Sequence, residues 1–128
     1  SSVRSARKTL HTASAEARDT LIDRGVEILQ VNAGVDGLID VTDAARIMAE
    51  RGLTRVLVEG GGQVAASFLK ANLVDRISSY RAGLVLGEDS RTAVGRLELE
   101  RLDFAPRFRL ASTRQLAGDT LETWQREA

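Results

Sequence analysis

The residues with the most chemical content form one short stretch, in which a carboxylate and three glycines follow an apolar run. Residues 56–58 are Val-Leu-Val, Glu59 follows them, and residues 60–62 are all glycine. A strand, a glycine turn and a helix start in succession let backbone N–H groups approach a phosphate, because glycine has no side chain to obstruct it. The pattern indicates a site for an anionic ligand. A plain glycine turn between a strand and a helix explains it equally well.

The glycine stretch matches only the loose form of known nucleotide motifs. Residues 60–65 fit the dinucleotide pattern G-x-G-x-x-A. The full fingerprint needs the first strand of a strand–helix–strand unit and an acidic residue about 20 positions further on. Here the strand is not the first and no acidic residue lies at that distance. A Walker A loop is excluded because no G-K-[ST] follows. What remains is a helix start with unpaired amides.

Two further side chains near this stretch are candidates for a ligand site. Glu59 stands at the end of the predicted strand, where open α/β sheets bind ligands, and its carboxylate can accept hydrogen bonds from sugar hydroxyls. A solvated strand end is the alternative. Ser67 is a small residue on the following helix, and its hydroxyl can also reach a phosphate. His11 is the only histidine and cysteine is absent, so no metal site is expected. The residues assign no catalytic group.

Composition narrows the classes of function. The 128 residues carry 18 Lys and Arg against 18 Asp and Glu, so no electrostatic footprint for nucleic acid or an anionic membrane is expected. No apolar run approaches the roughly 20 residues that span a bilayer. The lack of cysteine fits a cytoplasmic protein. The chain begins without methionine, so we expect a processed form or a piece of a longer polypeptide.

The elements that must position the glycine stretch alternate between strand and helix. This alternation over residues 8–59 predicts parallel strands with crossover helices. The expected fold class is α/β, with a mostly parallel sheet, flanking helices and a C-terminal antiparallel hairpin. The expected strands are 8–12, 26–31, 55–59, 74–82, 108–115 and 120–124. The expected helices are 15–24, 41–51 and one ending near residue 70, with Ser14 and Asp40 as N-caps and Gly25 and Gly52 as helix stops.

Five motifs then occur in a fixed order. They are Val-Leu-Val-Glu-Gly-Gly at 56–61, Leu-Val-Asp-Arg at 73–76, Ala-Gly-Leu-Val-Leu-Gly at 82–87, Leu-Glu-Arg-Leu at 99–102 and Leu-Glu-Thr-Trp at 121–124. The ordered set resembles the reductase domain of the bacterial riboflavin-biosynthesis deaminase–reductase, over about residues 9–124. The resemblance implies a dihydrofolate-reductase-like fold. It also implies NADPH-dependent reduction of the ribosyl group of 5-amino-6-(5-phosphoribosylamino)uracil to the ribityl form, with a hydride passing to the sugar C1′.

The same resemblance implies site residues and partners. Glu59 matches the carboxylate that binds the ribose of the substrate, a phosphoribosylaminopyrimidine. Thr12 is a weaker match to a polar residue near the cofactor. A homodimer joined through the sheet is implied as well. The loop and helix start that hold the NADPH phosphates are matched by Gly61, Gly62, Gln63, Val64, Ala65, Ala66 and Ser67.

The chain departs from the family pattern at its start. The first strands of the family's reductase domain and its zinc deaminase domain have no counterpart here. We therefore expect residues 1–128 to form the later part of a single reductase-like domain. A catalytically incomplete fragment, or a nucleotide-binding or dimerisation module of the same fold, is the alternative. A different pteridine or pyrimidine substrate is a third hypothesis, because a fold does not fix its chemistry.

Overall fold

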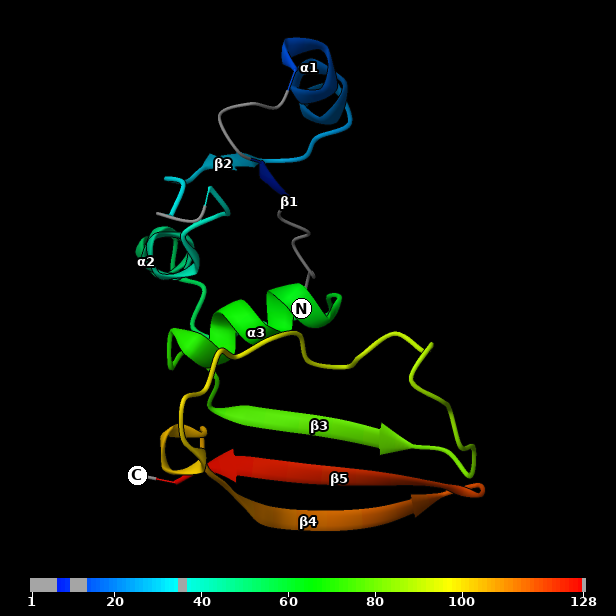
Figure 1. Cartoon of the computed structure of the whole chain (residues 1–128). Coiled ribbons are helices and arrows are strands. Elements are labelled where there is room, and N and C mark those ends of the chain that lie inside the picture. Colours follow the sequence, from blue (N-terminus) through cyan, green and yellow to red (C-terminus); the bar gives the residue numbers. More distant parts are fainter. Residues whose placement is uncertain (1–6, 10–13, 35–36, 128) are drawn as a thin grey trace. The chain divides into compact units, whose positions relative to one another are not determined.

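The computed structural model describes residues 7–9, 14–34 and 37–127, and the chain divides into two compact units (Figure 1). The first unit is Ser1–Leu57 and the second is Val58–Ala128. No helix in the described part of the chain is long and apolar enough to cross a membrane.

The first unit holds a short parallel sheet and two helices. Strand β1 (Arg7–Thr9) pairs in parallel with β2 (Ile28–Gln30), and helix α1 (Ala15–Asp23) lies between them in sequence. Helix α2 (Val41–Glu50) follows. The predicted parallel pairing of the first two strands is confirmed. Residues 10–12 of the predicted first strand, with Thr12 and His11, lie outside the described residues.

Local capping sets the boundaries of α1 and α2. The Ser14 hydroxyl accepts a hydrogen bond from the Ala17 amide at 3.3 Å. The Asp40 carboxylate accepts from the Thr42 amide at 2.9 Å and the Asp43 amide at 3.1 Å. A glycine with positive φ follows the C-cap of each helix, Gly25 at 74° after α1 and Gly52 at 76° after α2. Residues with a side chain rarely adopt such a φ. The predicted caps and stops are confirmed.

The carboxylate of Asp43 fastens the loop before α2. It accepts a 2.9 Å hydrogen bond from the Asn32 amide and forms an ion pair of 2.6 Å with Arg46. The amide of Asn32, and then the Arg46 guanidinium, hold the pKa of the Asp43 carboxyl below its usual value. The core of this unit consists of Leu29, Val31, Ala44 and Met48.

The predicted strand at residues 55–59 is wrong. Residues 53–61 carry no strand, and the side chains of Val56, Leu57 and Val58 are 49%, 79% and 40% exposed. An apolar run becomes a strand only when neighbouring chains accept and donate its backbone hydrogen bonds. The described residues supply no such neighbour, so the parallel sheet has two strands there.

The second unit is built on a three-stranded antiparallel sheet, whereas the described parallel sheet has only two strands. The predicted mostly parallel sheet is therefore wrong for the described residues, because antiparallel pairing predominates there. The second unit contains α3 (Gly62–Lys70), β3 (Arg76–Arg81), a 3₁₀ turn (Leu102–Phe104), β4 (Phe108–Leu116) and β5 (Asp119–Arg126). The strand order is β3-β5-β4. The predicted terminal hairpin is confirmed as β4 and β5. The sequence did not predict that β3 pairs with β5, which places Ile77 opposite Trp124.

Candidate functional site

The glycine stretch forms the N-terminal end of α3. Gly61 is the N-cap residue and, lacking a side chain, makes no capping hydrogen bond. The amides of Val64 and Ala65 donate to the Gly61 carbonyl at 3.0 and 3.2 Å. Within the described residues, the amides of Gly62 and Gln63 have no acceptor. Such amides, together with the helix dipole, favour an anion at this end of the helix.

The three glycines have three different surroundings. A Cβ on Gly60 would lie 3.1 Å from the Cβ of Val64. A Cβ on Gly61 would meet nothing within 4 Å, whereas one on Gly62 would lie 2.7 Å from the carbonyl oxygen of Thr92. Gly62 is therefore required for packing between backbone segments. Gly61 borders open space and is the glycine at which a ligand can approach.

Residues 92–98, called here the α3 strap, run beside the helix (Figure 1). The Gly95 amide donates a 2.8 Å hydrogen bond to the Gly62 carbonyl at the first turn of α3. Lys70, the last residue of α3, forms an ion pair of 2.6 Å with Glu98 of the strap. The strap thus spans the helix from end to end. No local signal in the sequence links Gly95 to Gly62, which lie far apart in the chain.

The predicted ligand residues differ in exposure, since most of those at the start of α3 are exposed and those further along the helix are buried or partly buried. Glu59 is exposed, and no hydrogen bond or ion pair to it is found in the described residues. Gln63 is also exposed at the helix start. Ala66 is buried at 4% exposure, and the Ser67 hydroxyl donates to the Gln63 carbonyl at 3.0 Å. The first turn is thus open to a ligand. The roles of residues 64–67 in cofactor binding stay predictions.

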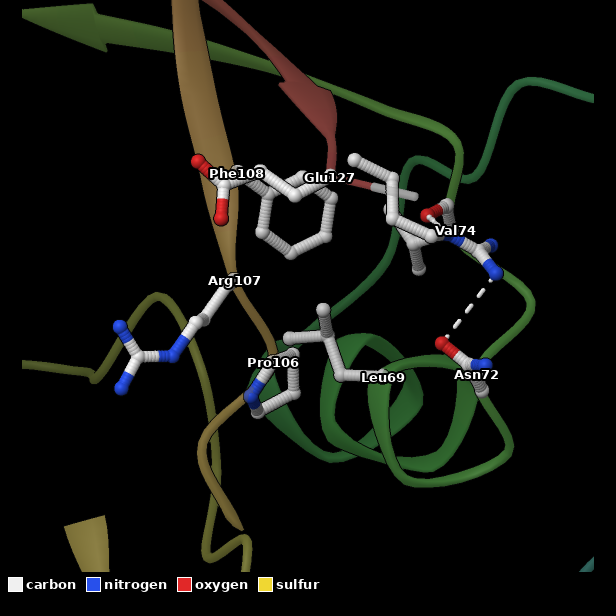
Figure 2. Close-up of a pocket in the computed structure, with 8 residues that line it drawn as sticks. Leu69, Asn72, Val74, Pro106, Arg107, Phe108 and Glu127 are labelled. Carbon is white, nitrogen blue, oxygen red and sulfur yellow. Dashed lines mark hydrogen bonds between the residues drawn. The ribbon is translucent and has the colours of Figure 1, made fainter. Parts of the chain in front are cut away.

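A hollow of about 190 Å³ lies at the opposite end of α3. Figure 2 shows Leu69, Pro106 and Phe108 around it, with the Arg107 side chain directed away. The Arg126 guanidinium at this hollow already donates to the Val74 carbonyl at 2.8 Å and to Asn72 at 3.2 Å. The guanidinium of Arg126 therefore already has acceptors within the chain. We take the first turn of α3, rather than this hollow, as the candidate site.

The described residues hold no group of three or more acidic, histidine or cysteine side chains that could bind a metal ion. The fold and the exposed helix start define an α/β protein with a glycine turn at which the amides of Gly62 and Gln63 are unpaired in the described part of the chain. Residues 3–121 match the profile of the RibD C-terminal domain, and the chain belongs to this family. The predicted resemblance to the reductase domain of the riboflavin-biosynthesis enzyme is confirmed.

Curated relatives agree with this membership. The chain is 30% identical over 98 residues to the riboflavin biosynthesis protein RibD of Actinobacillus pleuropneumoniae, covering 76% of this chain and 26% of that protein. It is 30% identical over 115 residues to the RibD protein of Chlamydia muridarum, covering 90% of this chain and 30% of that protein. The chain therefore spans less than a third of the length of either of these two relatives.

Solved structures share the fold. A RibD structure from Acinetobacter baumannii matches with a TM-score of 0.71 at 21% identity, over 94% of this chain and 31% of that one. A pyrimidine reductase-like protein from Corynebacterium diphtheriae matches with a TM-score of 0.68 at 21% identity, over 96% of this chain and 50% of that one. The chain therefore has the α/β fold of these proteins.

Proposed function

We propose that this chain carries the cofactor-binding part of an NADPH-dependent reductase of riboflavin biosynthesis. The reaction is reduction of the ribosyl group of 5-amino-6-(5-phosphoribosylamino)uracil to the ribityl form. Membership of the RibD C-terminal domain family supports the reaction class. The observation that carries the site is the open space at Gly61, beside the unpaired amides of Gly62 and Gln63.

Each residue of the site has a distinct role in this proposal. The amides of Gly62 and Gln63 donate hydrogen bonds to cofactor phosphate oxygens, and the missing side chain of Gly61 lets the phosphates approach. The exposed carboxylate of Glu59 accepts hydrogen bonds from the substrate ribose. The bound cofactor supplies the hydride for C1′, while the protein supplies position and electrostatics.

The proposal also covers the assembled enzyme. The two units belong to one domain of dihydrofolate-reductase-like fold, which is supported by a family match that runs from residue 3 to residue 121 and so includes both. The enzyme is a cytoplasmic homodimer that prefers NADPH to NADH. Analytical ultracentrifugation tests the dimer, with a monomer mass of 13.9 kDa as the contrary result. Parallel titrations with the two cofactors test the preference.

A second candidate is a nucleotide-binding fragment that cannot complete the reaction alone. It is favoured by the chain's coverage of only 26% and 30% of two RibD relatives, and by the unpaired apolar run at residues 56–58. Titration with NADPH, followed by a turnover assay with the substrate, separates the candidates. Saturable binding with substrate-dependent oxidation of NADPH supports the reductase. Binding without oxidation supports the fragment, and no binding contradicts both.

A further inference from the structure

We propose that Gly95 is a positioning residue for the cofactor site. Its backbone seats the first turn of α3, so a side chain at this position displaces the amides that receive the phosphates. The ligand in this inference rests on the proposed function. The contact geometry at Gly95 does not rest on the proposed function. It concerns only backbone contacts within the second unit.

The contact at Gly95 is between backbone atoms. Its amide donates a 2.8 Å hydrogen bond to the Gly62 carbonyl. A Cβ on Gly95 would lie 3.1 Å from the Gly62 oxygen, 3.3 Å from the Gly62 carbonyl carbon and 3.4 Å from the Gln63 Cα. Backbone atoms of a helix cannot rotate aside as a flexible side chain can. The added carbon must therefore move the helix start, the strap, or both.

Gly62, the other residue of this contact, also has no room for a side chain. A Cβ on Gly62 would lie 2.7 Å from the Thr92 oxygen and 3.0 Å from the Gly95 nitrogen. The strap and the helix start therefore approach this closely only because both residues are glycine. On the helix side of this contact, the residues that would shift are Gly62 and Gln63, whose amides are the proposed phosphate donors. Hydrogen bonds to an anion weaken steeply with displacement and misalignment.

The second anchor of the strap provides a control. Lys70 and Glu98 pair at the far end of α3, with side chains 40% and 75% exposed. An exposed pair of this kind contributes little to stability because water screens it. Removing it loosens the strap away from the first turn. Gly83 provides a second control, since a Cβ there meets nothing within 4 Å and its φ is not positive.

Calorimetric titration with NADPH tests the role of Gly95. We expect Gly95→Ala to raise the Kd about tenfold at unchanged binding stoichiometry, because the site is displaced in every molecule. Gly83→Ala and Lys70→Gln should keep the wild-type Kd. If Gly95→Ala instead lowers the stoichiometry at an unchanged Kd, the residue only holds the fold together and the proposal is wrong.

Hydrogen exchange provides a readout that needs no cofactor. Gly95→Ala should speed exchange of the Val64 and Ala65 amides, which close the first turn, while the β-sheet amides keep their wild-type rates. Gly83→Ala should leave both sets unchanged. If the wild-type chain does not bind NADPH, the proposed function is wrong. The exchange rates still show whether Gly95 positions the first turn of α3. First-turn exchange in Gly95→Ala equal to that of the wild type would overturn this positioning role.

Discussion

The amide of Gly95 donates a 2.8 Å hydrogen bond to the carbonyl of Gly62, and neither residue has room for a side chain. This contact shows that the glycines at residues 60–62 do not all have the same surroundings. Gly62 is explained by backbone packing against residues 92–95, whereas Gly61 borders open space. Of the two explanations that the sequence left equal, packing accounts for Gly62, and the anion site is the proposal for Gly61.

Gly62→Ala tests the packing role. Its Cβ would lie 2.7 Å from the Thr92 oxygen, so the substitution should lower the free energy of unfolding by about 1–3 kcal/mol, as overpacking does. Chemical denaturation measures the change. Gly61→Ala is the matched control and should change stability by about 0.5 kcal/mol or less, because nothing lies near it. Equal effects of the two substitutions would contradict the assignment.

Arg126→Ala tests the junction between β5 and the turn after α3. The guanidinium donates to the Val74 carbonyl and to Asn72, and pairs with Asp75 at 3.2 Å. Its loss should reduce the free energy of unfolding by about 1–3 kcal/mol, since a half-buried carbonyl loses a charged donor. Arg107→Ala is the control, because that side chain points away from the hollow (Figure 2). A neutral Arg126→Ala variant would show that the junction does not depend on this side chain.

Asp43→Asn tests whether the ionised carboxylate of Asp43 stabilises the loop before α2, by measuring stability as a function of pH. Folding lowers the pKa of Asp43, so its carboxylate contributes stability above the unfolded pKa, and that contribution is lost as the pH falls through the folded pKa. The wild type should exceed the variant in stability near neutral pH. The difference should shrink once the pH falls below about 4. Urea denaturation across this range measures it, and a difference independent of pH would argue against the ionised carboxylate.

Glu59→Gln separates the substrate role from the cofactor role. Glu59 is exposed and has no partner among the described residues, so the substitution should leave thermal stability and NADPH affinity unchanged. Substrate affinity should fall about tenfold, because an amide is a weaker acceptor for ribose hydroxyls than a carboxylate. Calorimetry with each ligand in turn checks this. A lower NADPH affinity with normal substrate binding would reassign Glu59 to the cofactor.

Local signals predicted the elements well, and contacts distant in sequence were missed. Ser14, Asp40 and Gly52 act on helix ends within a few residues, so their types alone predicted the caps. The strand at 55–59 was wrong because its formation depends on partner strands. The pairing of β3 with β5 and the Gly95–Gly62 contact were missed for the same reason. At the site, the sequence predicted the glycine turn but could not separate Gly61 from Gly62, and the role of Glu59 stays a prediction.

The most direct test of the central claim is calorimetric titration of the Gly61→Glu variant with NADPH, beside the wild type and Gly83→Glu. A carboxylate at the start of α3 interacts favourably with the helix dipole, so the variant should stay folded while repelling phosphate. The control adds the same charge at a glycine with open surroundings after β3. The account predicts saturable binding by the wild type and Gly83→Glu, and at least tenfold weaker binding by Gly61→Glu. Equal affinity of Gly61→Glu and the wild type would contradict it.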